Sequence, residues 1–312
     1  MNQHYSRRHF IKATATGLAG IAFTSTLLDL KKSKPCLSFS TLGCPDWSFD
    51  AILNFAVKHG YDGIEIRGLQ RQLDLTKCAE FSSKENLLAT RKKVEEKKIK
   101  IVDLGSSAAM HHADAAERKK NLDEAKNFIR LAQQLNCPYI RVFPNNFTKE
   151  QERNETIDLI VKGLLELGNY AKETGVTVLM ETHGDLVQSA DIENIMQLVG
   201  HPNIGIVWDM VNMWSVTKEP LAQVYAKLKK YIHLTHIKDL KFIDGKEQCA
   251  LLGRGDTPIL EAVDILAKDG YKGYYSFEWE KLWNPKIEEP EVALADYAKA
   301  MKRHFKTVFK IG

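Results

Sequence analysis

The sequence predicts an α/β protein with a single (β/α)8 TIM barrel spanning residues 35–312. Three observations support this fold class. Short apolar runs alternate with longer amphipathic stretches eight times in about 275 residues, and about 250 residues suffice for eight strand–helix units. The apolar runs are continuous, which is typical of parallel strands buried on both faces. No linker rich in Pro, Gly or Ser follows residue 36, so we expect one domain.

The first half of the barrel is predicted from four apolar runs, each followed by an amphipathic stretch. The helical pattern is clearest at 122–135, where apolar residues recur every three or four positions. Gly60 and Gly175 each follow a helical stretch and are expected to end it. The expected strands are 36–41, 63–66, 99–104 and 139–143. The expected helices are 49–59, 84–98, 122–135 and 157–165.

The second half repeats this alternation, and Ser189 or Asp191 is expected to cap one of its helices. The expected strands are 176–180, 204–208, 231–237 and 274–277. The expected helices are 190–199, 221–229, a stretch from 256 or 257 to 270, and 290–309. A doubly wound open sheet is the alternative architecture. It would require a glycine-rich first turn, which the segment 41–45 lacks.

Each of the last four predicted strands ends in a residue that can bind a metal. These residues are Glu181, Asp209, His236 and Glu278. The carboxyl ends of barrel strands meet at one face, which carries the active site. A buried carboxylate is costly unless something positive pairs with it. Three carboxylates and one imidazole form an oxygen-rich set that suits Mn²⁺, Mg²⁺ or Co²⁺, with Zn²⁺ as a further option.

Several short motifs follow one another from the first strand to the last. Through them the chain resembles the sugar phosphate isomerase/epimerase family of the xylose isomerase-like TIM barrel superfamily. Each motif is weak alone, so the resemblance depends on their order and spacing, and it covers nearly the whole chain after the N-terminal segment. The motifs are Leu42–Trp47 (LGCPDW), Gly60–Arg67 (GYDGIEIR), Met180–His183 (METH), Val207–Asp209 (VWD), His236–Asp239 (HIKD) and Ser276–Glu280 (SFEWE).

The resemblance implies a metal-dependent enzyme. In that family the metal ligands are the positions matched by Glu181, Asp209, His236 and Glu278. We expect Mn²⁺ in the first place, with Mg²⁺, Co²⁺ or Zn²⁺ as alternatives. In ketose 3-epimerases of the family the two glutamates are also the acid/base pair, so Glu181 and Glu278 are the expected catalytic residues. The metal would polarise a sugar carbonyl and stabilise the enediolate that forms when one glutamate removes the α-proton.

Isomerisation, epimerisation and β-elimination share this first step, so the four residues alone do not select among them. We expect an isomerase or epimerase acting on a small-molecule sugar or sugar derivative. The alternative is a lyase or hydratase acting on oxidised sugars such as 3-keto-glycosides, which an exported enzyme would meet more often than sugar phosphates. A non-catalytic sugar-binding barrel is a third hypothesis, which the presence of all four ligands argues against.

Five further residues near the strand ends are candidates for substrate binding. Each also has a simpler structural explanation. His183 could orient Glu181, Glu65 could form a salt bridge, and Lys238 could neutralise the carboxylates. His111 could simply be solvated, and Trp47 could pack in the core. The substrate-binding candidates are Glu65, His183, Lys238, His111 and Trp47.

Nucleic acid is not an expected partner, although the superfamily includes endonucleases for abasic DNA. Those enzymes need a three-zinc cluster with several more histidines. Here Asn212 stands where that cluster has a histidine, and the second strand offers only Glu65. The formal charge of +4 also provides no basic surface of the kind that binds DNA.

The N-terminal segment 1–34 is predicted to be a twin-arginine export signal and linker. Arg7 and Arg8 precede Phe10, Lys12 and a short apolar run. We therefore expect a periplasmic protein with no stable membrane span after processing, because the apolar run is short for a span. No two of the five cysteines have metal-type spacing, and nothing specifies a disulfide. Whether the chain forms homo-oligomers stays open.

Overall fold

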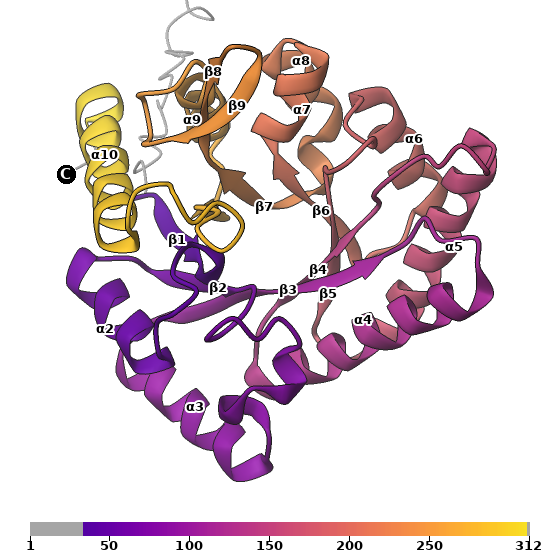
Figure 1. Cartoon of the computed structure of the whole chain (residues 1–312), viewed down its shortest axis with the longest axis horizontal. Coiled ribbons are helices and arrows are strands. Elements are labelled where there is room, and N and C mark those ends of the chain that lie inside the picture. The colour runs from indigo at the N-terminus through magenta and orange to yellow at the C-terminus, as the bar shows by residue number, and fades with distance from the viewer. Residues whose placement is uncertain (1–33, 311–312) are drawn as a thin grey trace, which may run out of the picture. The chain divides into compact units, whose positions relative to one another are not determined.

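Eight parallel strands close into a barrel in the computed structural model, which describes residues 34–310 (Figure 1). Around the barrel the strands follow the order β1-β10-β7-β6-β5-β4-β3-β2. This confirms the predicted (β/α)8 barrel. The strands are β1 (Cys36–Ser40), β2 (Gly63–Ile66), β3 (Lys100–Ala109), β4 (Tyr139–Phe143), β5 (Thr177–Glu181), β6 (Ile204–Asp209), β7 (Ile232–Ile237) and β10 (Tyr274–Phe277).

Helices surround the strands, and side chains hold several helix ends (Figure 1). Ser48, Ser83 and Asp114 accept hydrogen bonds from the first backbone N–H groups of their helices. Gly60 ends its helix with a left-handed φ of 66°. The helices are α2 (Phe49–His59), α3 (Lys84–Glu96), α4 (Ala115–Leu135), α5 (Arg153–Ala171), α6 (Ser189–Val199), α8 (Leu221–Leu228), α9 (Ile259–Lys268) and α10 (Pro290–Phe309), with 3-10 turns η1 (Thr41–Gly43), η2 (Leu75–Lys77), η3 (Ala79–Phe81) and η4 (Lys229–Tyr231).

Beyond shifts at helix ends, the structure differs from the sequence prediction in three places. Strand β3 continues to Ala109, beyond the predicted end at 104. A short helix, α7 (Met210–Thr217), begins immediately after β6 because Asp209 caps it. A hairpin of β8 (Asp239–Ile243) and β9 (Lys246–Ala250) follows β7 as a separate antiparallel sheet. Its turn is Asp244–Gly245, and both residues have positive φ, as an Asp-Gly hairpin turn requires.

Apolar side chains fill the barrel interior below the polar strand ends. Val102, Leu179, Val207 and Leu234 form a small cluster on β3, β5, β6 and β7, separate from the main core. Alternate residues of a strand face the same side. The residues two positions further along β5, β6 and β7 therefore also face the interior, directly above this cluster.

The predicted signal and linker at 1–34 lie outside the described residues, apart from Lys34, and stay a prediction. None of the helices in residues 34–310 combines the length and hydropathy that a membrane span requires. All five cysteines are free thiols, and three of them, Cys44, Cys78 and Cys137, are buried.

Candidate metal centre

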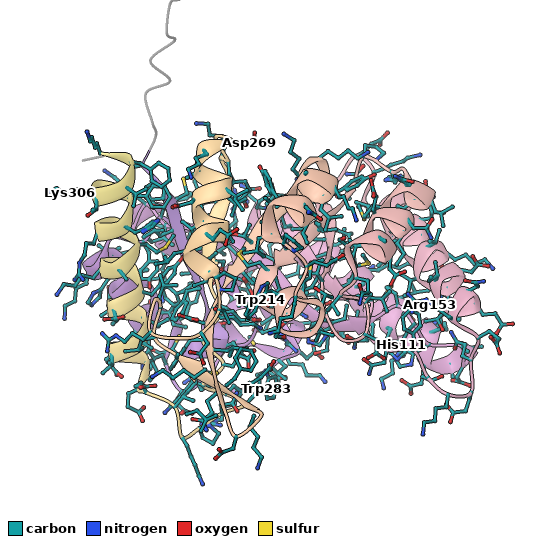
Figure 2. The ribbon with its side chains drawn as sticks, turned by 90° about the horizontal axis from the view of Figure 1, so that it is seen from above. His111, Arg153, Trp214, Asp269, Trp283 and Lys306 are labelled. Atoms are coloured by element: carbon teal, nitrogen blue, oxygen red, sulfur yellow. The ribbon has the colours of Figure 1, made fainter. Side chains whose placement is uncertain are left out.

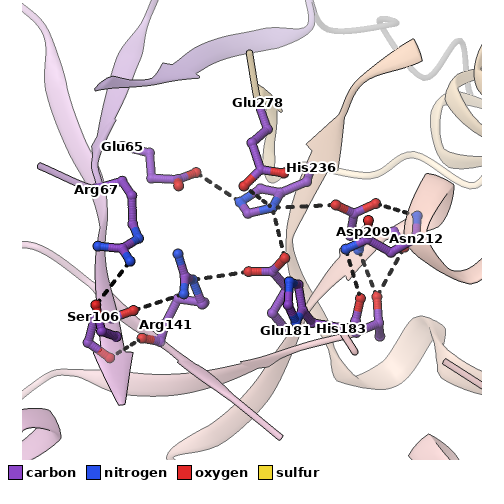
Figure 3. A network of polar contacts seen from close by, with 12 residues as sticks. Glu65, Arg67, Ser106, Arg141, Glu181, His183, Asp209, Asn212, His236 and Glu278 are labelled. Carbon is purple, nitrogen blue, oxygen red and sulfur yellow. Dashed lines mark hydrogen bonds and ion pairs between the residues drawn. The ribbon is translucent and has the colours of Figure 1, made fainter. Parts of the chain in front are cut away.

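Glu181, Asp209, His236 and Glu278 meet at the carboxyl ends of β5, β6, β7 and β10 (Figure 3). One ligand atom from each residue lies within 4.8 Å of those of the other three. All four side chains are buried, with Glu278 the most exposed at 7%. The barrel therefore brings the four predicted ligands together although up to 97 residues separate them in the sequence. We call these four residues the metal cluster.

His236 presents one ring nitrogen to the cluster and the other to Glu65. Its Nε2 lies 3.0 Å from the Glu65 carboxylate, which also accepts a hydrogen bond from Ser276. Its Nδ1 is buried without a hydrogen bond and lies 3.5 Å from Glu278, 3.7 Å from Glu181 and 3.9 Å from Asp209. Burial lowers the pKa of His236, but the carboxylates raise that pKa well above its ordinary value. Nδ1 thus faces a position that favours a cation.

Arg141 on β4 holds Glu181 from the side away from His236. The Arg141 Nε lies 3.0 Å from Glu181 Oε2, and both side chains are 2% exposed. The guanidinium also donates to the Ser106 carbonyl at 2.8 Å and lies 3.8 Å above the Phe143 ring. Burial raises the pKa of Glu181, but Arg141 and His236 outweigh it and hold that pKa below its usual value. Glu181 is therefore ionised at neutral pH.

Asp209 divides its two oxygens between α7 and the cluster. Oδ1 accepts the backbone N–H groups of Val211 and Asn212 at 3.1 Å and 2.8 Å, which caps α7. Oδ2 faces His236 Nδ1 and lies 2.8 Å from Lys238 Nζ. Burial raises the pKa of Asp209 to about 6, even though Lys238 opposes that rise.

Lys238 supplies a positive charge beside the cluster. Its Nζ lies 2.8 Å from Asp209, 2.9 Å from Glu278 and 3.1 Å from Glu280. Burial lowers the pKa of Lys238, but these carboxylates raise it well above its ordinary value. Burial raises the pKa of Glu278, while Lys238 and His236 bring it below its ordinary value. In the structure Lys238 therefore neutralises carboxylates, which is one of the two roles considered for it.

Two of the predicted substrate-binding residues make contacts within the protein that match a structural role. Glu65 is 0% exposed and bonds His236 and Ser276, so it orients the imidazole and does not line the open mouth. It does not pair with Arg67 or a lysine, which was the simpler prediction. Trp47 packs against Phe55 of α2 with ring centroids 4.9 Å apart, so it belongs to the packing between β1 and its helix.

His183 and His111 lie at the same end of the barrel as the cluster. His183 Nδ1 is 3.0 Å from the Asn145 side-chain oxygen, and its ring lies 4.5 Å from that of Phe143. Burial lowers the pKa of His183, and Glu181 opposes this more strongly than any other charge. The His111 ring lies against that of His112, with centroids 4.1 Å apart and the planes tilted by 35°, and His111 is half-buried. Their roles as substrate contacts stay a prediction.

Two charged residues inside the barrel were missed at the sequence level. Arg141 is the partner of Glu181. Asp103 on β3 is 0% exposed, and neither of its carboxylate oxygens has a hydrogen bond. Burial and the neighbouring Glu65 raise the pKa of Asp103 well above its ordinary value. A charged residue inside an apolar strand run was the available signal for both.

The fold and this cluster define a (β/α)8 barrel with a three-carboxylate, one-histidine site at the carboxyl ends of its strands. The chain belongs to the xylose isomerase-like TIM barrel family, whose sequence model matches residues 53–304. This confirms the family resemblance.

Relatives of the chain include two enzymes and a zinc-binding protein of known structure. The chain is 26% identical over 235 residues to an inosose isomerase of Halalkalibacterium halodurans, covering 72% of this chain and 80% of the relative. It is 26% identical over 205 residues to a 3-dehydroshikimate dehydratase of Bacillus anthracis, covering 63% of this chain and 68% of the relative. The crystal structure of the IOLI protein with a binding zinc atom matches this chain with a TM-score of 0.72 at 20% identity. The match covers 87% of this chain and 98% of the IOLI chain.

Proposed function

We propose that the chain is a metal-dependent isomerase or epimerase acting on a carbohydrate. The observation that carries this proposal is the buried, unbonded Nδ1 of His236, which faces three carboxylates within 4 Å. Such a donor set fits a divalent cation held by Glu181, Asp209, His236 and Glu278. Mn²⁺ suits its oxygen-rich character best, and the zinc atom of the IOLI structure makes Zn²⁺ a second metal to test. The inosose isomerase relative supports a sugar-like substrate.

The bound cation would polarise a substrate carbonyl and stabilise the negative charge that develops on its oxygen. The two glutamates would move the proton. Around the barrel the strands run β10-β7-β6-β5, so Glu278 and Glu181 lie at the two ends of the arc that holds the cluster. A substrate between them meets one carboxylate from each side. One glutamate, in its ionised form, would accept the α-proton. The other would first take up a proton from solvent and then return it to the opposite face.

The second candidate is a lyase or dehydratase on an oxidised sugar such as a 3-keto-glycoside. The relative named 3-dehydroshikimate dehydratase favours it, because elimination beside a carbonyl starts with the same proton removal. In that case the glutamate that does not take the α-proton would protonate the leaving oxygen. The cluster geometry serves both reactions, so the product distinguishes them.

Deuterium exchange tests the proposed chemistry. The Mn²⁺-loaded protein is incubated in deuterated water with ketoses, inososes and 3-keto-glycosides and followed by NMR. We expect deuterium to appear on the carbon next to the carbonyl of at least one sugar. An isomer or epimer as product supports the first candidate, and an unsaturated product supports the second. No exchange with any of these sugars, with metal bound, would exclude both.

Substitution of Asp209 by alanine is expected to weaken metal binding at least tenfold, because Asp209 Oδ2 faces the cluster and its loss removes one of four ligands. Metal content after dialysis, measured by plasma mass spectrometry, checks this. Asp296→Ala is the control, since Asp296 pairs with Arg254 at the surface. Metal content equal to that of the wild type would show that the ligand set is wrong. A wild-type protein that binds no divalent ion would favour the non-catalytic sugar-binding barrel.

We further propose that the chain is exported by the twin-arginine route to the periplasm. The support is the order Arg7-Arg8, Phe10, Lys12 and the following apolar run. The double substitution Arg7→Lys, Arg8→Lys keeps the charge and is expected to retain the protein in the cytosol. Cell fractionation measures this. Unchanged export of the double variant would contradict the proposal.

A further inference from the structure

A pocket of about 950 Å³ lies beside the metal cluster. Lys238, Asn212 and Glu280 line its inner wall. Two of these touch the cluster directly: Lys238 Nζ is 2.8 Å from Asp209 Oδ2, and the Asn212 N–H donates to Asp209 Oδ1 at 2.8 Å. The four cluster residues themselves are not part of the lining. The pocket is therefore a neighbouring compartment that shares a wall with the cluster.

The two outer walls are the β8–β9 hairpin and the segment 283–288. Lys218 braces the hairpin by lying 4.6 Å above the Phe242 ring of β8 and 3.7 Å above the Trp214 ring of α7. The segment 283–288 is held from inside by Lys281, whose Nζ donates to the carbonyls of Pro285 at 2.9 Å and Ile287 at 2.6 Å. Both walls are thus braced by contacts within the protein, and such preorganisation lowers the cost of binding.

Trp283 is the large aromatic residue of the pocket wall, and 53% of it is exposed. It lies toward the end of the molecule opposite Asp269 and Lys306 (Figure 2). Trp279, four residues earlier in the chain, is by contrast buried and donates its indole N–H to the Glu288 carbonyl. An exposed indole beside polar groups is a surface on which the C–H face of a sugar ring can stack.

The charges around the pocket argue against an anionic ligand. Glu247, Glu280 and Glu288 line it, against Lys238 and Lys286. Lys238 is already paired with three carboxylates at 2.8–3.1 Å. The remaining lining combines three neutral amide side chains with Trp283 and several apolar residues. The pocket therefore favours an uncharged ligand with many hydroxyl groups and disfavours a phosphate. These neutral side chains are Asn212, Gln248 and Asn284.

We propose that this pocket binds a second, uncharged sugar residue joined to the ring that reacts at the metal cluster. The substrate class is then a neutral glycoside, and neither a monosaccharide nor a sugar phosphate. Its volume is near the upper end of the roughly 300–1,000 Å³ of small-molecule sites. A single ring placed over the cluster would leave this compartment unfilled. The assignment of the reacting ring rests on the proposed function, whereas binding in the pocket can be measured without turnover.

Calorimetric titration of the Mn²⁺-loaded protein tests binding with cellobiose, maltose, trehalose, glucose and glucose 6-phosphate. We expect at least one disaccharide to bind about tenfold more tightly than glucose, and glucose 6-phosphate to bind no better than glucose. Trp283→Ala is expected to weaken disaccharide binding about tenfold and leave glucose binding unchanged. Tyr170→Ala, an exposed aromatic residue on the outer helix α5, is the matched control and is expected to change neither. The proposal is wrong if no disaccharide exceeds glucose, or if Trp283→Ala binds it like the wild type.

Turnover then separates this proposal from the proposed function. If Trp283-dependent disaccharide binding occurs without deuterium exchange in any sugar, the pocket assignment stands and the enolising function fails. If exchange occurs with equal kcat/KM for a ketose and a 3-keto-glycoside, and Trp283→Ala raises neither KM, the pocket assignment fails and the function stands. An increase of KM confined to the glycoside, with kcat unchanged, supports both.

Discussion

Replacing Glu181 by glutamine is expected to lower turnover by about 10³-fold while the barrel stays folded, since general acid–base catalysis contributes roughly 10²–10⁴-fold. Glutamine keeps the shape of the side chain and its hydrogen bonds but can neither accept the α-proton nor hold the cation by charge. Glu278→Gln is expected to lose activity to the same degree, because the proposed mechanism uses the two glutamates as a pair on opposite sides of the substrate. Steady-state rates at saturating Mn²⁺ and thermal melts measure the two effects.

The two glutamine variants are also expected to differ in deuterium exchange. For an epimerase, the variant that keeps the proton-removing glutamate can still exchange the α-proton of that sugar but forms no product. The variant that lacks the proton-removing glutamate neither exchanges the α-proton nor forms product. The two variants exchange these roles when the epimer is the substrate. Glu166→Gln is the control, because Glu166 pairs with Lys126 on the outer helices. Wild-type turnover by either Glu181→Gln or Glu278→Gln would contradict the assigned roles.

The sequence was sufficient to predict the barrel because each of its strands is a short buried run that ends near a polar residue. The cluster could be predicted for the same reason. Once four strands are parallel neighbours, residues at their carboxyl ends must share one face, whatever their separation in the chain. The structure brings Glu181, Asp209, His236 and Glu278 within 4.8 Å of one another. Their roles as ligands and catalysts remain predictions.

What could not be predicted depends on which side chains meet across the barrel. Glu65 closes β2 in the sequence like a substrate contact, yet its partner is His236, 171 residues away, and only the closed barrel shows that it faces the imidazole. The β8–β9 hairpin was missed because both strands are only five residues long and β9 is mostly polar and exposed, although Asp244-Gly245 is a recognisable turn. That hairpin forms one wall of the pocket beside the cluster.

Arg141 presents the largest expected effect on stability. Its substitution by methionine is expected to destabilise the protein by about 3–5 kcal/mol, because it leaves the Glu181 carboxylate buried without its ion pair at 3.0 Å. For a chain of this size, that destabilisation lowers the melting temperature by about 10 °C relative to the wild type. Arg254→Met is the matched control. It removes an ion pair with Asp296 at 2.9 Å from an arginine that is 61% exposed, so its cost should stay below about 1 kcal/mol.

The metal adds a second, more specific expectation for Arg141→Met. A divalent cation bound at the cluster would neutralise Glu181 from the other side, so the loss of Arg141 should cost less in metal-loaded protein than after treatment with a chelator. Unfolding of the wild type and the variant with and without Mn²⁺ forms a double cycle that measures this coupling. Equal destabilisation in the two states would mean that the cation does not act on Glu181. A cost as small as that of Arg254→Met would mean that Glu181 does not need the Arg141 ion pair.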